Sequence, residues 1–146
     1  MAYWDTSALV KLYAAEPDSA LFAAEAMNAP TAVVTSRLAV YEAWATFQRK
    51  EAAGALQPGA ARKLYAELQQ DVAAGELRLV ELGDDVEREY GQVLAACYGQ
   101  SPPVALRTLD ALHLASARAV SEIEVVATDK RVRCAAKALG FSLFPA

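Results

Sequence analysis

Four acidic residues stand at positions where an unpaired carboxylate would be costly. They are Asp5, Glu42, Asp110 and Asp129. Asp5 and Asp129 each end a short apolar run, whereas Glu42 and Asp110 lie within segments rich in Ala and Leu. A buried charge without a partner costs several kcal/mol. We therefore expect these residues, called the four acids below, to share a bound cation.

A site built only from carboxylate oxygens favours a hard ion, and Mg²⁺ or Mn²⁺ fits best. One or two carboxylates would bind the ion directly, and the remaining acids would orient or deprotonate a bound water. Without a cation the acids would repel one another and some of their pKa values would rise. The neighbouring hydroxyls of Thr6, Ser7 and Thr128 could orient the carboxylates or cap helices.

Each acid also has a simpler interpretation. Asp129 could cap a helix that begins at Lys130, which is worth about 1 kcal/mol. Asp110 could complement the dipole of its helix from the first turn. Glu42 has mostly apolar neighbours one helical turn away, which predicts a buried face, although an isolated exposed Glu is the alternative. Asp5 follows the first apolar run, which we expect to be a central strand.

The spacing of apolar residues predicts strands alternating with helices. Strands are expected over residues 2–4, 32–35, 77–82, 124–128 and 142–144. Helices are expected over residues 7–15, 19–28, 36–53, 59–74, 84–98, 108–120 and 130–139. This pattern is typical of an α/β fold with a mostly parallel sheet covered on both faces. In such sheets sites form beyond the carboxyl ends of strands, where Asp5 and Asp129 are expected.

Two further features concern the surface and the size of the protein. The helices expected over 36–53 and 59–74 should project as a hairpin that serves as a lid or a dimer surface. The 146 residues, 55% of them hydrophobic and 22% charged, fit one compact domain spanning 1–146. No apolar run reaches the roughly 20 residues of a membrane span. The opening residues do not resemble a secretion signal, so we expect a cytoplasmic protein.

The cysteines, the single histidine and the net charge argue against a zinc site and against broad electrostatic binding of nucleic acid. Cys97 and Cys134 both lie in Ala-rich helical patterns and are expected to be buried and reduced. With one His and no C-x-x-C pair, a zinc site lacks ligands. The net charge of −4 argues against broad electrostatic binding of nucleic acid, but leaves room for a local basic rim and a basic protein partner.

Four segments together resemble the signature blocks of the PIN domain family. They are YWDTSAL at 3–9, YE at 41–42, TLDALHLA at 108–115 and ATDKR at 127–131. Their order and spacing are similar to those of the VapC branch, the toxins of bacterial and archaeal toxin–antitoxin pairs. The resemblance implies a three-layer fold in which helices flank a mostly parallel central sheet, with a protruding helical hairpin and a single PIN domain over 1–146.

The resemblance also implies an activity. The four acids would bind Mg²⁺ or Mn²⁺, with Asp5 and Asp110 as direct ligands, and would cleave RNA phosphodiester bonds by in-line attack of metal-activated water. It further implies a homodimer and an antitoxin that inserts a C-terminal segment near the site. The alternative is a catalytically silent PIN-fold module that binds RNA or protein. The target RNA depends on loops and dimer geometry rather than on the acids.

Four basic residues lie close in sequence to the acidic segments. Lys11, Arg107, Lys130 and Arg131 are candidate contacts for RNA phosphates, or else ordinary surface charges. Lys130 and Arg131 stand out because cations in the first turn of a helix oppose its dipole. RNA phosphates would explain their presence.

The single histidine and the aromatic residues are expected to be structural. His113 follows Asp110 by three positions, yet a lone His between two Leu residues is more often a hydrogen-bonded core side chain. The expected mechanism works without it. Tyr3, Trp4, Tyr41 and Trp44 are expected in the core, and a dimer contact is the alternative for Trp44.

Other enzyme classes that use acids or phosphate loops fit poorly. A phosphotransfer receiver needs an acidic pair near its first strand, and a haloacid-dehalogenase-like phosphatase needs D-x-D, whereas Asp5 is followed by Thr6 and Ser7. Gly54 and Gly59 have the spacing of a nucleotide-binding loop. Two alanines replace the Lys and Ser/Thr that would engage phosphate and magnesium, which disfavours nucleotide hydrolysis.

Overall fold

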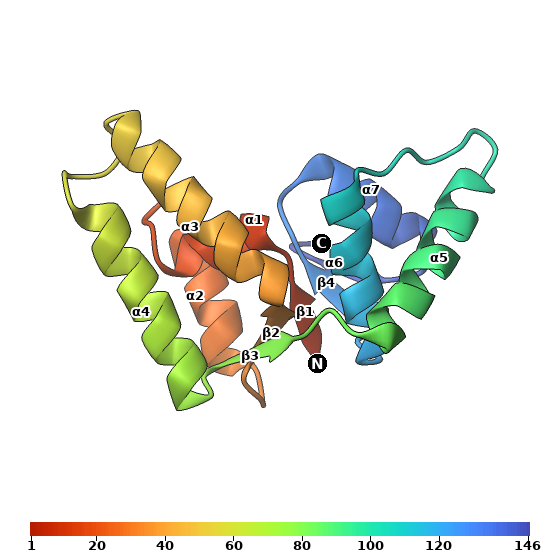
Figure 1. Ribbon diagram of the computed structural model, residues 1–146, viewed down its shortest axis with the longest axis horizontal. Coiled ribbons are helices and arrows are strands. Elements are labelled where there is room, and N and C mark those ends of the chain that lie inside the picture. Colours follow the sequence, from red (N-terminus) through yellow and green to blue (C-terminus); the bar gives the residue numbers. More distant parts are fainter.

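A five-stranded parallel sheet forms the centre of the computed structural model, which describes residues 1–146 (Figure 1). The strands are β1 (Ala2–Trp4), β2 (Val33–Ser36), β3 (Leu77–Val80), β4 (Glu124–Val126) and β5 (Ser142–Phe144). Their spatial order is β3-β2-β1-β4-β5, and every neighbouring pair is parallel. β1 therefore occupies the centre of the sheet, as expected, and Asp5 follows its carboxyl end.

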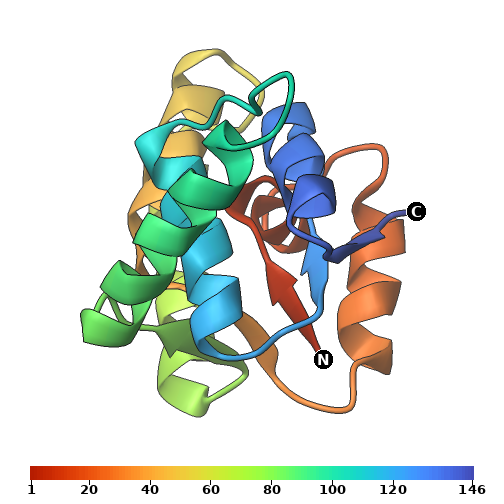
Figure 2. The ribbon, with the colours of Figure 1, turned by 90° about the vertical axis from the view of Figure 1, so that its right-hand side faces the viewer.

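Helices cover both faces of this sheet. They are α1 (Thr6–Leu9), the 3₁₀ helix η1 (Val10–Leu12), α2 (Ser19–Asn28), α3 (Arg37–Ala52), α4 (Ala60–Ala74), α5 (Asp84–Tyr98), α6 (Thr108–Ala119) and α7 (Lys130–Ala138). Figure 2 shows the sheet between α2 on one side and the α5–α6 pair on the other. The predicted three-layer α/β fold is confirmed. None of these helices is both long and apolar enough to cross a membrane.

Alternation of side chains along β1 divides the core between the two faces. Tyr3 is fully buried in a cluster with residues of α5, α6 and α7. Trp4, 2% exposed, points to the opposite face, where it meets Phe22 of α2 edge to face with ring centroids 6.2 Å apart. Both aromatic residues are core, as expected. Burial on both faces fixes the register of β1 and hence the place where Asp5 leaves the sheet.

The hairpin of α3 and α4 projects from one end of the molecule (Figure 1). The two helices pack through a second core cluster that includes Phe47 and Leu68. Gly54 and Gly59 bound the connecting loop with positive φ angles of 79° and 84°, which non-glycine residues rarely adopt. The predicted hairpin is confirmed, and α3 carries Glu42 from it toward the sheet.

Some elements are shorter than the sequence predicts. The helix expected over 7–15 is one α-helical turn followed by one 3₁₀ turn that ends at Leu12. The strands expected to reach residues 82 and 128 stop at Val80 and Val126. Their paired neighbours turn into helices at the same level, so the ladder ends there.

Three side chains expected in the core are exposed. Tyr41 is 61% exposed and Trp44 is 43% exposed, because α3 buries the other side of its surface, formed by Ala39, Val40, Ala43 and Phe47. Cys134 is exposed because α7 turns Val132, Ala135 and Ala136 inward instead. These three predictions were wrong. Cys97 is buried and both thiols are free, as expected.

Candidate active site

The four acids line one cavity of about 520 Å³ at the carboxyl edge of the sheet. Asp5 follows β1, and Asp129 follows β4 after two further residues. Glu42 reaches the cavity from α3, and Asp110 from the first turn of α6. The predicted convergence of Asp5, Glu42, Asp110 and Asp129 is therefore present in the fold.

Asp5 is held by the turn from β1 into α1. Its backbone is extended, and its Oδ2 accepts hydrogen bonds from the backbone N of Ser7 at 3.1 Å and from Ser7 Oγ at 2.5 Å. The side chain thus caps α1 while remaining only 4% exposed. Burial raises the pKa of the Asp5 carboxyl, although His113 and the hydrogen bonds from Ser7 oppose the increase.

Replacing Asp5 with Asn should stabilise the metal-free protein at neutral pH. An acid whose pKa is raised by folding penalises the folded state once pH exceeds its unfolded pKa of about 3.9, and the penalty is absent below that pH. Asn keeps an oxygen acceptor for Ser7. We expect the melting temperature in a chelating buffer to rise by about 2–4 °C at pH 7, the shift that about 1 kcal/mol produces in a domain of this size.

The same comparison at pH 4 provides the control. Protonation then removes the charge of Asp5, so the difference between Asp5→Asn and the unmodified protein should shrink toward zero. A destabilised Asp5→Asn variant at pH 7 would show that burial of the Asp5 charge does not limit stability.

Glu42 belongs to a buried hydrogen-bond network centred on His113. The Glu42 carboxylate accepts from His113 Nε2 and from Thr6 Oγ1, the latter at 2.9 Å. On the other side of the ring, His113 Nδ1 lies 2.6 Å from the hydroxyl of Tyr3. Since the Glu42 carboxylate can only accept, Nε2 carries a proton. In the neutral imidazole the Tyr3 hydroxyl then donates to Nδ1, whereas in the protonated ring Nδ1 donates to the Tyr3 hydroxyl oxygen. In both forms the two bonds fix the orientation of the ring.

The charges of this network oppose the effect of burial. Burial alone would lower the pKa of His113, but the bond to Glu42 and the nearby Asp5 and Asp110 carboxylates raise it. Burial alone would raise the pKa of Glu42. The hydrogen bond from His113, the charge of His113 and the hydrogen bond from Thr6 hold the pKa of Glu42 below its ordinary value. Glu42 therefore stays ionised at neutral pH.

Arg107 lies over the other two acids. Its Nε donates to Asp110 Oδ2 at 3.0 Å, and its terminal Nη2 lies 3.8 Å from Asp129 Oδ2. The other oxygen of Asp129 caps α7 by accepting from the backbone N of Arg131 and Val132. Asp129 thus combines the capping role with a place in the cavity, which the sequence had presented as alternatives.

Comparison with known proteins identifies the family to which this arrangement belongs. A family model described as PIN domain matches residues 2–138. The chain belongs to the PIN domain family. It is also 34% identical to Ribonuclease VapC45 and to Ribonuclease VapC49, both from Mycobacterium tuberculosis, over 150 residues that cover 100% of this chain and 96% of each relative. The predicted resemblance to the VapC branch is confirmed.

Solved structures share the fold of this PIN domain. The crystal structure of Mycobacterium tuberculosis VapC20, a Sarcin-Ricin loop cleaving toxin, has a TM-score of 0.68 at 19% identity, covering 92% of this chain and 95% of VapC20. FitAcB from Neisseria gonorrhoeae has a TM-score of 0.65 at 18% identity, covering 99% of this chain and 96% of the other. At these identities the likeness extends to the fold alone.

The hydroxyls next to the acids divide into two groups. Thr6 binds Glu42, and Ser7 Oγ joins Asp5 to the backbone N of Thr128 at 3.0 Å and of Asp129 at 3.2 Å. Ser7 thus ties the turn after β1 to the turn after β4. Thr128 itself contacts no acid, since its Oγ1 donates to the carbonyl O of Ser7 at 3.4 Å.

Of the four basic residues singled out in the sequence, only Arg107 lines the acidic cavity of the PIN domain. Lys11 is held by ion pairs to Glu16 at 2.5 Å and Asp18 at 2.8 Å. Lys130 and Arg131 line a separate hollow beside residues 102–105. The structure therefore does not bring these three residues into the cavity with the acids.

Two residues of the site escaped the sequence analysis. Arg49 lines the cavity two helical turns after Glu42, on the same side of α3, and this spacing was the available signal. His113 was expected to be buried and hydrogen-bonded, and it is 1% exposed. Its bond to Glu42 was not expected, although its spacing of three from Asp110 places both residues on one side of α6.

The donor set fits a hard divalent ion by chemical type, because the four acids supply only oxygen. As the side chains stand, no three of the Asp, Glu, His and Cys residues lie close enough together to hold one ion. Arg107 and His113 instead compensate the carboxylates. Ligation of one ion by several acids therefore requires the carboxylate side chains to move closer together. Asp110 would also have to exchange Arg107 for the ion, which the 59% exposed side chain of Arg107 permits.

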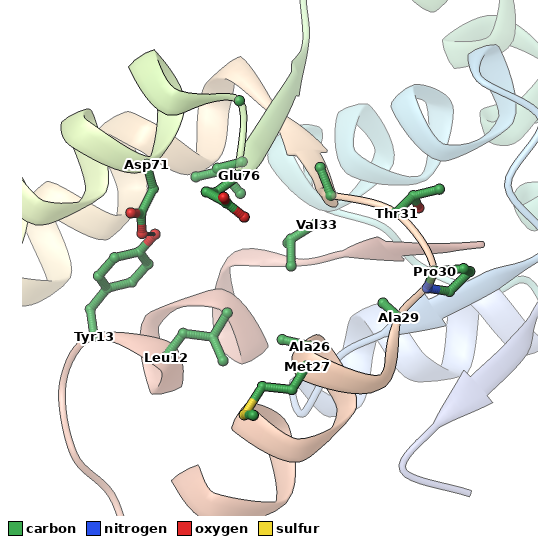
Figure 3. A pocket seen from close by; sticks show the side chains of 13 residues that line it. Leu12, Tyr13, Ala26, Met27, Ala29, Pro30, Thr31, Val33, Asp71 and Glu76 are labelled. Atoms are coloured by element: carbon green, nitrogen blue, oxygen red, sulfur yellow. Dashed lines mark hydrogen bonds between the residues drawn. The ribbon is translucent and has the colours of Figure 1, made fainter.

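A second cavity, of about 570 Å³, lies at the opposite edge of the sheet, at the start of β2 and β3 (Figure 3). It is slightly larger but carries only two carboxylates, Asp71 and Glu76, and no basic side chain. Asp71 already accepts a hydrogen bond from the Tyr13 hydroxyl at 2.6 Å. Volume alone would favour this cavity, but the four acids line the other one.

Proposed function

We propose that this PIN domain, spanning residues 1–146, is a metal-dependent endoribonuclease and the toxin of a VapC-type toxin–antitoxin pair. The observation that carries the proposal is the meeting of four carboxylates from four separate segments in one cavity. Its support in sequence is the 34% identity, over the full length of the chain, to two VapC ribonucleases. A catalytically silent module would have no need to keep all four acids together.

Asp5 and Asp110 are the proposed direct ligands, and Glu42 and Asp129 complete the acidic site. A bound Mg²⁺ or Mn²⁺ would activate the attacking water and neutralise charge that develops on the phosphoryl oxygens. Glu42, kept ionised by His113, would orient the attacking water or accept its proton. Ser7 and Thr6 hold the Asp5 and Glu42 carboxylates in position.

Arg107 and Arg49 are the proposed contacts for the RNA backbone. Both line the acidic cavity, and Arg49 forms no ion pair with a carboxylate. If Arg107 leaves Asp110 as the metal binds, its guanidinium becomes free for a phosphate oxygen. One arginine would thus compensate the acids in the free protein and the substrate during cleavage.

The proposed partners are RNA, a cognate antitoxin and a second copy of the chain, acting in the cytoplasm. A basic antitoxin side chain could occupy the place that Arg107 holds between Asp110 and Asp129. Such a contact would keep the acids from the metal and the RNA at once.

RNA cleavage by the purified protein tests this function. We expect single-stranded RNA of mixed sequence to be cut internally when Mg²⁺ or Mn²⁺ is present, and cleavage to stop when EDTA removes the ion. The same cleavage assay is repeated with Ca²⁺, because this ion is larger than Mg²⁺ and accepts looser coordination. Binding of RNA without any cleavage under all metal conditions would favour the catalytically silent module instead.

A further inference from the structure

An exposed aromatic surface on α3 adjoins the acidic cavity. Tyr41 and Trp44 are both exposed, and together with Ala45 and Gln48 they line a shallow hollow of about 320 Å³. Tyr41 and Ala45 also line the acidic cavity. The hollow and the cavity therefore share a rim, and an RNA strand that leads away from the acids would cross this rim.

The Trp44 ring is already part of a stack. It lies over the ring of Tyr65 of α4 with centroids 4.1 Å apart and planes 9° from parallel. The Tyr65 ring covers one face of the indole, while Trp44 remains 43% exposed. A stack held in this way loses little conformational freedom when another flat ring is added. Planar π-systems are the ligands that such a surface favours.

The helical repeat places chemically different side chains in sequence around α3. At 3.6 residues per turn, neighbouring directions around the axis are taken by Trp44, Gln48, Tyr41, Ala45, Arg49 and Glu42. Arg49 is exposed, and its guanidinium donates only to the Thr46 hydroxyl at 3.0 Å. The surface thus runs from a ring stack, past an arginine, to a carboxylate of the proposed catalytic site.

We propose that Trp44, backed by Tyr65 and flanked by Tyr41, is a platform on which a base of single-stranded RNA stacks next to the scissile phosphate. This inference rests on the proposed ribonuclease function. A flat ring for the base and Arg49 for the adjoining phosphate match the alternation of base and phosphate in a single strand. Tyr41, Trp44 and Arg49 are then positioning residues for the substrate.

The size of the hollow argues for a base rather than for a protein partner. Only four residues line it. A stable protein interface typically buries about 800 Å² on each partner, far more than so small a hollow offers. One heterocyclic ring is the ligand of matching size and shape.

Tryptophan fluorescence tests the platform independently of cleavage. The chain has two Trp residues, and Trp4 is buried, so a stacked base should quench only Trp44. The Asp5→Asn protein, which should not cut, is titrated with 12-residue oligouridylate and oligoadenylate. We expect saturable quenching that is absent when Trp44→Phe is added to this variant.

Affinity measured by anisotropy of labelled RNA separates stacking from general binding. Trp44→Phe should bind within about threefold of its parent, whereas Trp44→Leu should bind about 5- to 100-fold more weakly, the range expected for the loss of one base stack. Ile123→Ala is the matched control, since Ile123 is 72% exposed but precedes β4 at the opposite edge of the sheet. Its affinity should not change.

Unchanged RNA affinity in Trp44→Leu would overturn the platform. If the molar mass of Trp44→Leu on sedimentation also fell, the surface would be assigned to contact between copies of the chain. Cleavage by the unmodified protein tests the ribonuclease function separately, so failure of the platform would leave that function standing.

Discussion

Replacing Asp110 with Asn should lower the rate of RNA cleavage by about a hundred- to a thousandfold, the loss typical when one group that stabilises transition-state charge is removed. Asp110 is a proposed direct ligand, and Asn offers a neutral oxygen in place of a charged one. The same loss is expected for Asp5→Asn. Initial rates of cleavage of a labelled RNA at saturating Mn²⁺ provide the measurement.

Asp85→Asn is the matched control for this prediction. Asp85, like Asp110, is an acid in the first turn of a helix, but it lies on α5 outside the acidic cavity. Asp85→Asn should cleave at the unmodified rate, and all three variants should keep a cooperative melting transition. Cleavage by Asp110→Asn within about threefold of the unmodified protein would exclude Asp110 from the catalytic site.

The second large effect concerns stability. Replacing His113 with Ala should lower the free energy of unfolding by about 3–5 kcal/mol, because it leaves a cavity and removes a partner from a buried acid. The Glu42 carboxylate would lose the bond that offsets its burial, and the Tyr3 hydroxyl would lose its partner at Nδ1. In a domain of this size the melting temperature should fall by about 6–20 °C.

Two further variants identify the cause of this loss. Tyr3→Phe removes one hydrogen bond and keeps the ring, so it should cost only about 1 kcal/mol. His113→Gln keeps a donor for Glu42 and should lose less stability than His113→Ala. Thermal unfolding followed by circular dichroism at pH 7 gives the values. A melting temperature for His113→Ala within about 2 °C of the unmodified protein would contradict the proposed network.

The acids could be located from sequence because each of them follows from a local pattern. Asp5 ends an apolar run that is central in the sheet, and Asp129 follows another. Parallel strands present their carboxyl ends at one edge, so the meeting of these two acids follows from the fold class. Glu42 was found because its neighbours along α3 are mostly apolar. The prediction of Asp110 relied on the family resemblance as well.

The contacts of the site could not be predicted because they join distant parts of the chain. His113 and Glu42 are 71 positions apart, and no local pattern indicates that α6 and α3 meet at these residues. Lys11 was wrongly expected near the acids because closeness in sequence does not guarantee closeness in the fold. It lies six residues from Asp5, but the early end of the first helix lets Glu16 and Asp18 capture its ammonium.

The exposed aromatic residues show a further limit of composition. Tyr41 and Trp44 were expected in the core because large apolar side chains are usually buried. The spacing of Val40, Ala43 and Phe47 defines the buried side of α3 and leaves Tyr41 and Trp44 outside it. Their exposure beside the acids is the basis of the proposed base platform.

Anomalous scattering from crystals grown with Mn²⁺ tests the proposed metal site most directly. We expect one strong peak in the acidic cavity, bound by oxygens of Asp5 and Asp110, with the Arg107 side chain displaced from Asp110. A matched crystal of Asp110→Asn should lose or weaken the peak. Absence of any peak in the cavity at saturating Mn²⁺, or a peak bound by residues other than the four acids, would contradict a shared divalent ion at this site.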